Sequence, residues 1–172
     1  MLAFKERACT TLKPAWPLEP RTRSQGLTVF FQNCMGLFPN LNLLKAKIAA
    51  SPWDVIALVE TWLPALPGDV QTLLRTFHYQ FLSLPATLSC VPGACDKRGI
   101  MVFVKDHWHL SSVVAHWCDF GKLLGFTIVG VCRCVVFYRT ALNTIWAYDW
   151  MLSLFSNADS CLPTLWIGDF NW

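Results

Sequence analysis

The sequence predicts a layered α/β fold in which helices cover a partly parallel sheet. Three observations support this prediction. Short apolar runs rich in β-forming residues alternate with helix-like segments in the first half of the chain, and hairpin-like pairs of apolar runs follow in the middle. Hydrophobic residues make up 54% of the 172 residues and charged residues only 15%. That composition indicates a chain with ample apolar surface to bury, and it argues against disorder.

The expected elements follow one another along a single domain. Residues 1–26 are punctuated by proline and charge, so we expect a flexible tail followed by a domain over 27–172. We expect strands at 27–32, 54–60, 79–84, 99–104, 123–131, 133–138 and 164–167. We expect helices at 41–50, where Asn40 would cap the first turn, at 70–76 and at 142–155.

The longest apolar run does not predict a membrane span. Leu123–Tyr138 contains Arg133 and falls short of the ~18–20 uninterrupted apolar residues that a spanning helix needs. The N-terminal segment lacks the apolar core of a secretory signal. We therefore expect an intracellular protein, nuclear or cytoplasmic, that has no membrane partner and keeps its eight cysteines reduced.

Three of the expected strands end in polar or acidic groups. Asn33 follows the first, Glu60 ends the second, and Asp169 with Asn171 follows the last. Strand ends that meet at one edge of a sheet are where layered folds assemble a site. Two carboxylates with side-chain amides suit a hard cation such as Mg²⁺ or Mn²⁺. Each residue taken alone is more often a cap or a turn former.

These residues lie in motifs that resemble those of the endonuclease/exonuclease/phosphatase superfamily. Five short motifs stand in the superfamily's order: QNCMGL at 32–37, VIALVETWL at 55–63, KRGIMV at 97–102, VFYR at 136–139 and IGDFN at 167–171. The second is similar to the superfamily pattern D-x-I-x-L-x-E-T-W-L, and the last to G-D-x-N. The ETWL and YR motifs most resemble those of the endonuclease domains of non-LTR retrotransposons.

The resemblance implies an incomplete four-layer α/β sandwich, with a mixed sheet and helices on its outer face. It also implies a magnesium-dependent DNA endonuclease that hydrolyses a phosphodiester by metal-assisted attack of water. Glu60 would hold the metal ion, and Asp169 would orient or deprotonate the water, with Asn171 fixing Asp169 or the phosphate. Asn33 would support the metal or Asp169, and Tyr138 would donate a hydrogen bond to the phosphate.

Three further side chains are candidates for substrate binding. Trp62 follows the metal-binding glutamate and would lie at the rim of the cleft. Arg98 and Arg139 could meet phosphates, although a solvated surface arginine is the alternative for both. The net charge of +3 permits a polyanionic ligand such as DNA without requiring one. We expect no small-molecule cofactor besides the metal ion.

The resemblance is interrupted shortly after its last motif. The superfamily continues for roughly another third of the domain, which supplies a further Asp and a catalytic His, and none of the four histidines lies downstream of Asp169. We therefore expect impaired catalysis and self-association through the edge that the missing part would cover. Two alternatives stay open: a non-catalytic, retrotransposon-derived fragment with weak or no nucleic-acid binding, or a phosphatase of the same superfamily.

Overall fold

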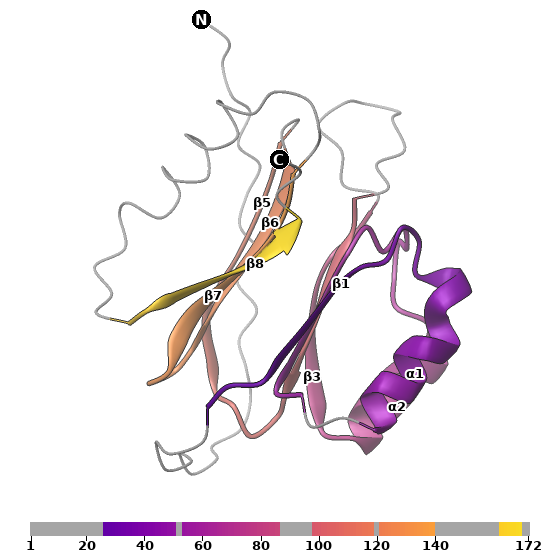
Figure 1. Ribbon diagram of the computed structural model, residues 1–172, viewed down its shortest axis with the longest axis horizontal. Helices are drawn as coiled ribbons and strands as arrows, with labels where there is room; N and C mark the ends of the chain where they lie inside the picture. Colours follow the sequence, from indigo (N-terminus) through magenta and orange to yellow (C-terminus); the bar gives the residue numbers. More distant parts are fainter. Residues whose placement is uncertain (1–25, 51–52, 87–97, 119–120, 140–161, 170–172) are drawn as a thin grey trace, which may run out of the picture.

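Two four-stranded sheets face each other, and two helices lie against the outer face of the first sheet (Figure 1). The structure is a computed structural model that describes residues 26–50, 53–86, 98–118, 121–139 and 162–169. Both sheets mix parallel and antiparallel pairs, which confirms the predicted α/β class with mixed pairing. The predicted tail, except for Gly26, and the helix expected at 142–155 lie outside the described residues.

The first sheet has the strand order β1-β2-β4-β3. Its strands are β1 (Val29–Asn33), β2 (Val55–Val59), β3 (Tyr79–Leu84) and β4 (Ile100–Lys105). The pairing of β1 with β2 is parallel, with Asn33 opposite Val59, and the other two pairings are antiparallel. The carboxyl ends of β1 and β2 therefore lie side by side.

Strand β2 is buried on both faces. Val55, Ala57 and Val59 pack toward the second sheet, whereas Ile56 and Leu58 pack toward the helices. A strand covered on both sides needs apolar residues at every position rather than at alternate ones. This explains the continuous apolar run in the sequence, and it gives the residue that follows β2 a rigid support.

The helices α1 (Leu41–Ala49) and α2 (Gly68–Thr76) bury residues four positions apart. Leu44 and Ile48 from α1, and Val70 and Leu74 from α2, join the core on the outer side of the first sheet. That spacing places both side chains of each helix on one face. No helix in the described part of the chain is long and apolar enough to cross a membrane.

Asn40 occupies the expected N-cap position of the first helix, but its side chain does not make the expected capping hydrogen bond. Asn40 is also the last residue of the short 3₁₀ helix η1 (Phe38–Asn40), which precedes α1. The side-chain amide donates instead to the carbonyl oxygens of Cys34 and Gly36, each at 3.2 Å. Asn40 therefore braces the loop that follows β1 rather than the first turn of the helix.

The second sheet has the strand order β5-β6-β7-β8. Its strands are β5 (Leu110–Cys118), β6 (Gly121–Ile128), β7 (Cys132–Arg139) and β8 (Thr164–Asp169). The pairing of β7 with β8 is parallel, with Tyr138 opposite Asp169, and the other two pairings are antiparallel. The second parallel pair thus also brings two carboxyl ends together.

This sheet contains one strand that was not expected and strand boundaries that differ from those expected. Strand β5 was not predicted, because its register shifts between Ser111 and Val114 and Ser112 has a φ of 50°, so the alternation that marks a strand is interrupted. Strand β6 begins at Gly121 rather than at residue 123, and it includes Lys122. A lysine ends an apolar run in the sequence, whereas the hydrogen-bonded ladder continues through it.

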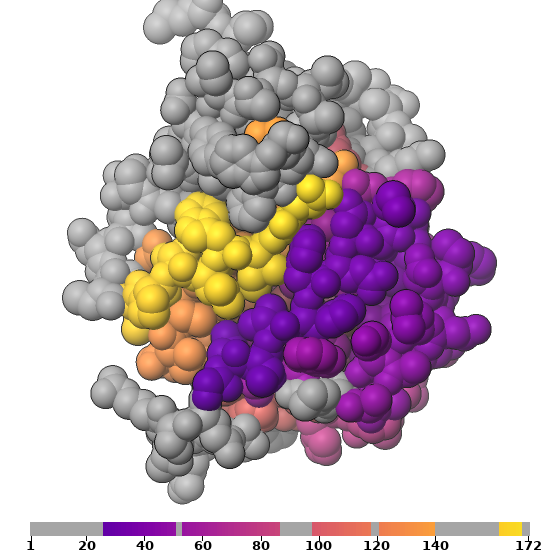
Figure 2. All heavy atoms as spheres, in the orientation of Figure 1, coloured from indigo at the N-terminus to yellow at the C-terminus, as the bar shows by residue number. Residues whose placement is uncertain are grey.

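The main core lies between the two sheets. Strand β8 packs against β1, and β7 packs against β2; Figure 2 shows yellow β8 lying against indigo β1 on one face of the molecule. The side chains that fill the space between the sheets come from both of them and include Val55, Ala57, Val59, Leu84, Ile100, Val102, Leu124, Phe126, Cys134, Val136 and Ile167. Residues at the carboxyl ends of β1, β2, β7 and β8 border this core.

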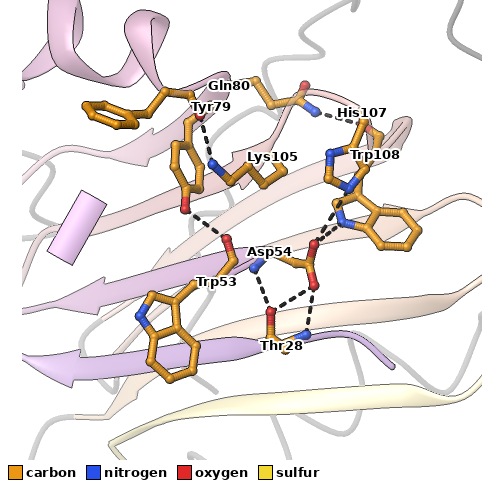
Figure 3. Close-up of polar contacts among 9 residues, drawn as sticks. Thr28, Trp53, Asp54, Tyr79, Gln80, Lys105, His107 and Trp108 are labelled. Carbon is orange, nitrogen blue, oxygen red and sulfur yellow. Dashed lines mark hydrogen bonds and ion pairs between the residues drawn. The ribbon is translucent and has the colours of Figure 1, made fainter. Parts of the chain in front are cut away.

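A polar cluster around Asp54 holds together the amino-terminal ends of β1 and β2 (Figure 3). Asp54 directly precedes β2, and its Oδ2 accepts hydrogen bonds from the backbone N–H of Thr28 at 3.0 Å and from the Thr28 hydroxyl at 2.8 Å. Its Oδ1 accepts a bond from the indole N–H of Trp108 at 3.0 Å and lies 3.6 Å from Nε2 of His107. His107 and Trp108 belong to the connection that leads from the first sheet to the second.

The surroundings of Asp54 lower its pKa. Burial acts to raise the pKa, but the hydrogen bonds from Thr28 and Trp108 and the neighbouring His107 outweigh burial, so the folded-state pKa lies below the ordinary value. A lowered folded-state pKa stabilises the fold above the unfolded-state value of about 3.9 and ceases to do so as the pH falls through the folded-state value. Asp54 is therefore a structural carboxylate that favours the fold at neutral pH.

Replacing Asp54 with Asn should lower the free energy of unfolding at neutral pH by on the order of 2 kcal/mol, because charged acceptors make the stronger hydrogen bonds. Urea unfolding of both proteins over a series of pH values measures this. The difference between them should shrink as the pH falls through the acid range. The control is Asp106→Asn, because Asp106 is an exposed residue that pairs with His78. This substitution should change the free energy of unfolding little. A constant difference at every pH would contradict the role of the Asp54 charge.

Candidate active site

Four polar side chains meet where the two parallel strand pairs end. Asn33 is the last residue of β1, and Glu60 directly follows β2. Tyr138 and Asp169 lie opposite each other near the ends of β7 and β8. Because β1 packs against β8 and β2 packs against β7 and β8, the two pairs of strand ends face each other across the core. The sequence analysis expected the strand ends at Asn33, Glu60 and Asp169 to meet at one edge of a sheet, whereas the structure brings these three residues together from two facing sheets.

The side chain of Asn33 joins the two sheets at this edge. Its Nδ2 donates a hydrogen bond to Oε1 of Glu60 at 3.0 Å and another to Oδ2 of Asp169 at 2.7 Å. Its Oδ1 accepts a bond from the backbone N–H of Met35 at 3.1 Å. That third bond fixes which end of the amide faces the carboxylates, because only the NH₂ end can donate to them. One amide group therefore holds two carboxylates from different sheets close to a common point.

The backbone around Glu60 is held in an uncommon conformation. Glu60 and Trp62 have φ values of 51° and 56°, and Met35 in the facing loop has a φ of 43°. Left-handed conformations of non-glycine residues cost on the order of 1 kcal/mol each and are found mainly where surrounding bonds enforce them. Here the N–H groups of Gly36 and Leu37 donate to the carbonyl oxygens of Glu60 and Thr61, each at 2.9 Å. The parallel ladder thus continues past both strands and fixes the direction of Glu60.

Two glycines make this close approach of loops possible, and neither was singled out from the sequence. A Cβ on Gly36, whose φ is 99°, would lie 2.8 Å from Cε3 of Trp62. A Cβ on Gly99 would lie 2.3 Å from the buried hydroxyl oxygen of Thr61. Both glycines stand inside motifs that the sequence displays, but only their contacts show that they bracket the segment after Glu60.

The hydroxyl of Tyr138 is kept as a hydrogen-bond donor. Burial raises its pKa most, the Glu60 carboxylate that accepts its hydrogen bond raises the pKa further, and the negative charge of Asp169 acts in the same direction. The cation of Arg98 opposes these effects but does not cancel them. Tyr138 therefore stays protonated across the physiological pH range. In this structure its hydrogen bond goes to Glu60, the residue that the sequence analysis assigns to the metal.

The oxygen atoms at this edge fit a hard divalent cation. Among the described residues no group of three or more His, Cys, Asp or Glu side chains forms a metal cage. The atoms that converge are instead two carboxylates, Glu60 and Asp169, around the amide of Asn33. Mg²⁺ is characteristically held by one or two carboxylates, with water and substrate phosphate completing its shell. A pair of carboxylates with an amide therefore suits a hard cation such as Mg²⁺ better than it suits a structural zinc ion.

The predicted substrate-binding residues are placed differently from one another. Trp62 is 42% exposed and lies two residues after Glu60, as expected for a rim position. Arg98 is half-buried and close enough to influence the pKa of Tyr138. Arg139 is 2% exposed, and strand alternation places it on the other face of β7 from Tyr138. The structure thus does not bring Arg139 together with the carboxylates, and Asn171 lies outside the described residues.

Solved structures show the same fold at low sequence identity. The human nocturnin catalytic domain, with bound sulfate, matches with a TM-score of 0.56 at 17% identity. A 3′ phosphatase from Neisseria, NExo, bound to a product DNA hairpin, gives a TM-score of 0.58 at 14% identity, and an AP endonuclease from Archaeoglobus fulgidus gives 0.56 at 15%. Each match covers 85% of this chain.

The chain spans only part of these relatives, namely 64% of the nocturnin domain and 58% of each of the other two proteins. None of the curated protein sequences compared with this chain matches it. Residues 32–172 do match the family described as the Endonuclease/Exonuclease/phosphatase family, and that match includes Asn33, Glu60, Tyr138 and Asp169. By fold and by sequence, this chain belongs to the endonuclease/exonuclease/phosphatase family.

Proposed function

We propose that this chain carries the site of a magnesium-dependent phosphodiesterase that cleaves DNA, of the kind found in non-LTR retrotransposon endonucleases. The observation that carries the proposal is the Asn33 amide, which holds the carboxylates of Glu60 and Asp169 together across the two sheets. Two carboxylates kept close together at the ends of these strands concentrate negative charge at one place. A divalent cation offsets that charge and at the same time attracts a phosphate.

Each side chain has a role that follows from its surroundings. Glu60 is the metal ligand, because β2 supports it rigidly and its backbone conformation is fixed by the neighbouring loop. A magnesium ion held there would supply Lewis-acid stabilisation of the charge that develops on the phosphate. Asp169 orients and deprotonates the attacking water, and Asn33 keeps Asp169 in place for that task. Tyr138, protonated throughout, is the donor for a phosphate oxygen.

DNA is the substrate that the surroundings of the site favour. The ETWL and YR motifs, which contain Glu60 and Tyr138, resemble those of retrotransposon endonucleases. Trp62 presents an exposed indole two residues after Glu60. An exposed aromatic ring beside a phosphate site suits the stacking of a base. Two of the structural relatives are an AP endonuclease and a 3′ phosphatase bound to a product DNA hairpin. Phosphomonoester hydrolysis at a DNA 3′ end is the competing activity, and a panel of nicked, abasic and 3′-phosphorylated duplexes would separate the two.

The second candidate is a chain that folds and binds metal without catalysis. Metal binding needs only the carboxylates of Glu60 and Asp169, which the Asn33 amide already holds together, whereas cleavage needs every member of a catalytic unit. Removing one member of a catalytic unit commonly lowers the rate by several orders of magnitude. Metal binding and cleavage therefore need separate tests.

Magnesium should stabilise the wild-type chain but not Glu60→Gln. At a free concentration a hundredfold above the dissociation constant, binding adds about 2.7 kcal/mol to the stability, which is roughly 5–10 °C in Tm for a domain of this size. Differential scanning fluorimetry with and without magnesium measures the shift. The exposed-site variant Asp106→Asn should respond like the wild type. If Glu60→Gln showed the full shift as well, Glu60 would not be the metal ligand.

Plasmid nicking in magnesium tests catalysis itself. The wild-type chain should convert supercoiled plasmid to the open circle, and Asp169→Ala should abolish the conversion, because the water then lacks its base. Asp106→Ala, which removes a carboxylate distant from the site, should nick like the wild type. Equal nicking by wild type and Asp169→Ala would reject the catalytic role of Asp169. A wild type that binds magnesium but does not nick would establish the non-catalytic alternative.

A further inference from the structure

Lys122 is a lysine with no exposed surface, and the roles proposed above do not use it. It lies near the start of β6 and is 0% exposed. Its Nζ donates a hydrogen bond to the carbonyl oxygen of Pro85 at 2.9 Å and is 3.5 Å from that of Ala86. A lysine is almost never fully buried unless its ammonium group has partners, because desolvating a charge is costly. The burial of Lys122 therefore indicates that its ammonium group makes specific contacts that offset the cost of desolvation.

The strand register places Lys122 in the same row as two residues of the site. Lys122 pairs with Tyr138 across β6 and β7, and Tyr138 pairs with Asp169 across β7 and β8. Directly paired residues point to the same face of a sheet. The three side chains therefore face the first sheet together, and Lys122 is the next residue in the row after Tyr138.

The carbonyls that Lys122 holds belong to the first sheet. Pro85 and Ala86 directly follow β3, and the backbone N–H of Ala86 donates to the carbonyl oxygen of Leu63 at 3.2 Å. Leu63 lies three residues after Glu60 on the same loop. Lys122 is thus connected, through two successive hydrogen bonds, to the segment that carries Glu60 and Trp62.

A second contact closes this connection around Glu60. The N–H of Thr61 donates to the carbonyl oxygen of Gly99 at 3.2 Å. Gly99 packs so closely that an added Cβ would lie 3.2 Å from the backbone nitrogen of Ala86 and 2.3 Å from the hydroxyl oxygen of Thr61. The segments after β2 and β3 and the segment before β4 therefore form one packed layer of backbone, which we call the rim, made of 60–63, 85–86 and 98–99.

We propose that Lys122 is a positioning residue of the site: its buried ammonium group anchors the rim to the second sheet and so fixes the distance between Glu60 and the Tyr138–Asp169 pair. The inference rests on the proposed function, in which Glu60 binds the metal ion close to Asp169. Asn33 sets the separation of the carboxylates on the β1–β8 side, and Lys122 sets the separation of the sheets on the β3–β6 side. A metal ion that needs oxygen ligands at a fixed spacing depends on both.

The test compares Lys122→Met with Lys105→Met in the full chain. Lys105 is a matched control, because its Nζ also donates to a backbone carbonyl, that of Phe77 at 2.8 Å, but Lys105 ends β4, whereas the segment at Gly99 precedes it. Isothermal titration with Mn²⁺ gives the dissociation constant, and amide hydrogen exchange followed by NMR gives the mobility of the rim. Lys122→Gln, which keeps a neutral donor of similar length, provides a second variant.

Lys122→Met should bind Mn²⁺ about tenfold more weakly than the wild type, as expected when a group that supports a metal ligand is removed. The amides of Thr61 and Ala86 should exchange faster in Lys122→Met, and Lys122→Gln should lie between the wild type and Lys122→Met. Lys105→Met should lower the Tm but leave the Mn²⁺ affinity and the exchange of both amides unchanged.

Three results would overturn the proposal. One is a folded Lys122→Met or Lys122→Gln protein with wild-type Mn²⁺ affinity, and another is unchanged exchange at Thr61 and Ala86. The third is failure of both variants to fold, which would assign Lys122 to the fold itself. If the wild type bound no Mn²⁺, the proposed metal function would fail, and the exchange data would still decide whether Lys122 anchors the rim.

Discussion

The pair of hydrogen bonds from the Asn33 amide is the interaction on which the site depends. Neither sheet holds both carboxylates, since Glu60 follows a strand of the first sheet and Asp169 ends a strand of the second. Two carboxylates that approach each other repel unless a donor or a cation lies between them. The amide of Asn33 provides that donor in the folded chain. The two carboxylates therefore come together only when the two sheets pack against each other.

The two carboxylates that flank β2 show how surroundings decide function. Asp54 precedes the strand, and three hydrogen bonds from Thr28 and Trp108 occupy both of its oxygens, so it holds neighbouring segments together. Glu60 follows the strand at the edge of the core, in a left-handed conformation that aims it at Asn33 and Tyr138. The same rigid strand thus carries a structural carboxylate at one end and the proposed metal ligand at the other.

Local patterns in the sequence were sufficient to predict which polar residues end the strands, but not which residues they contact in the folded chain. Asn33, Glu60 and Asp169 each lie at the end of a recognisable apolar run, so their positions at strand ends were predictable, although their origin in two different sheets was not. The bond from Asn33 to Asp169 joins residues 136 positions apart and depends on how two sheets pack, which no local pattern encodes. Strand β5 was missed because a bulge interrupts its alternation, and Lys122 was overlooked because a lysine in an apolar run ordinarily indicates the surface.

The most direct test of this account is a magnesium titration of ¹⁵N-labelled protein, observed through the side-chain amide of Asn33 in a heteronuclear correlation spectrum. Because that amide bridges both carboxylates, its signals should move together with the backbone amides of Glu60 and Asp169 and give one dissociation constant. A single shared midpoint would establish that the two sheets present one metal site. Movement of Glu60 alone, with the Asn33 side chain and Asp169 unaffected, would contradict it.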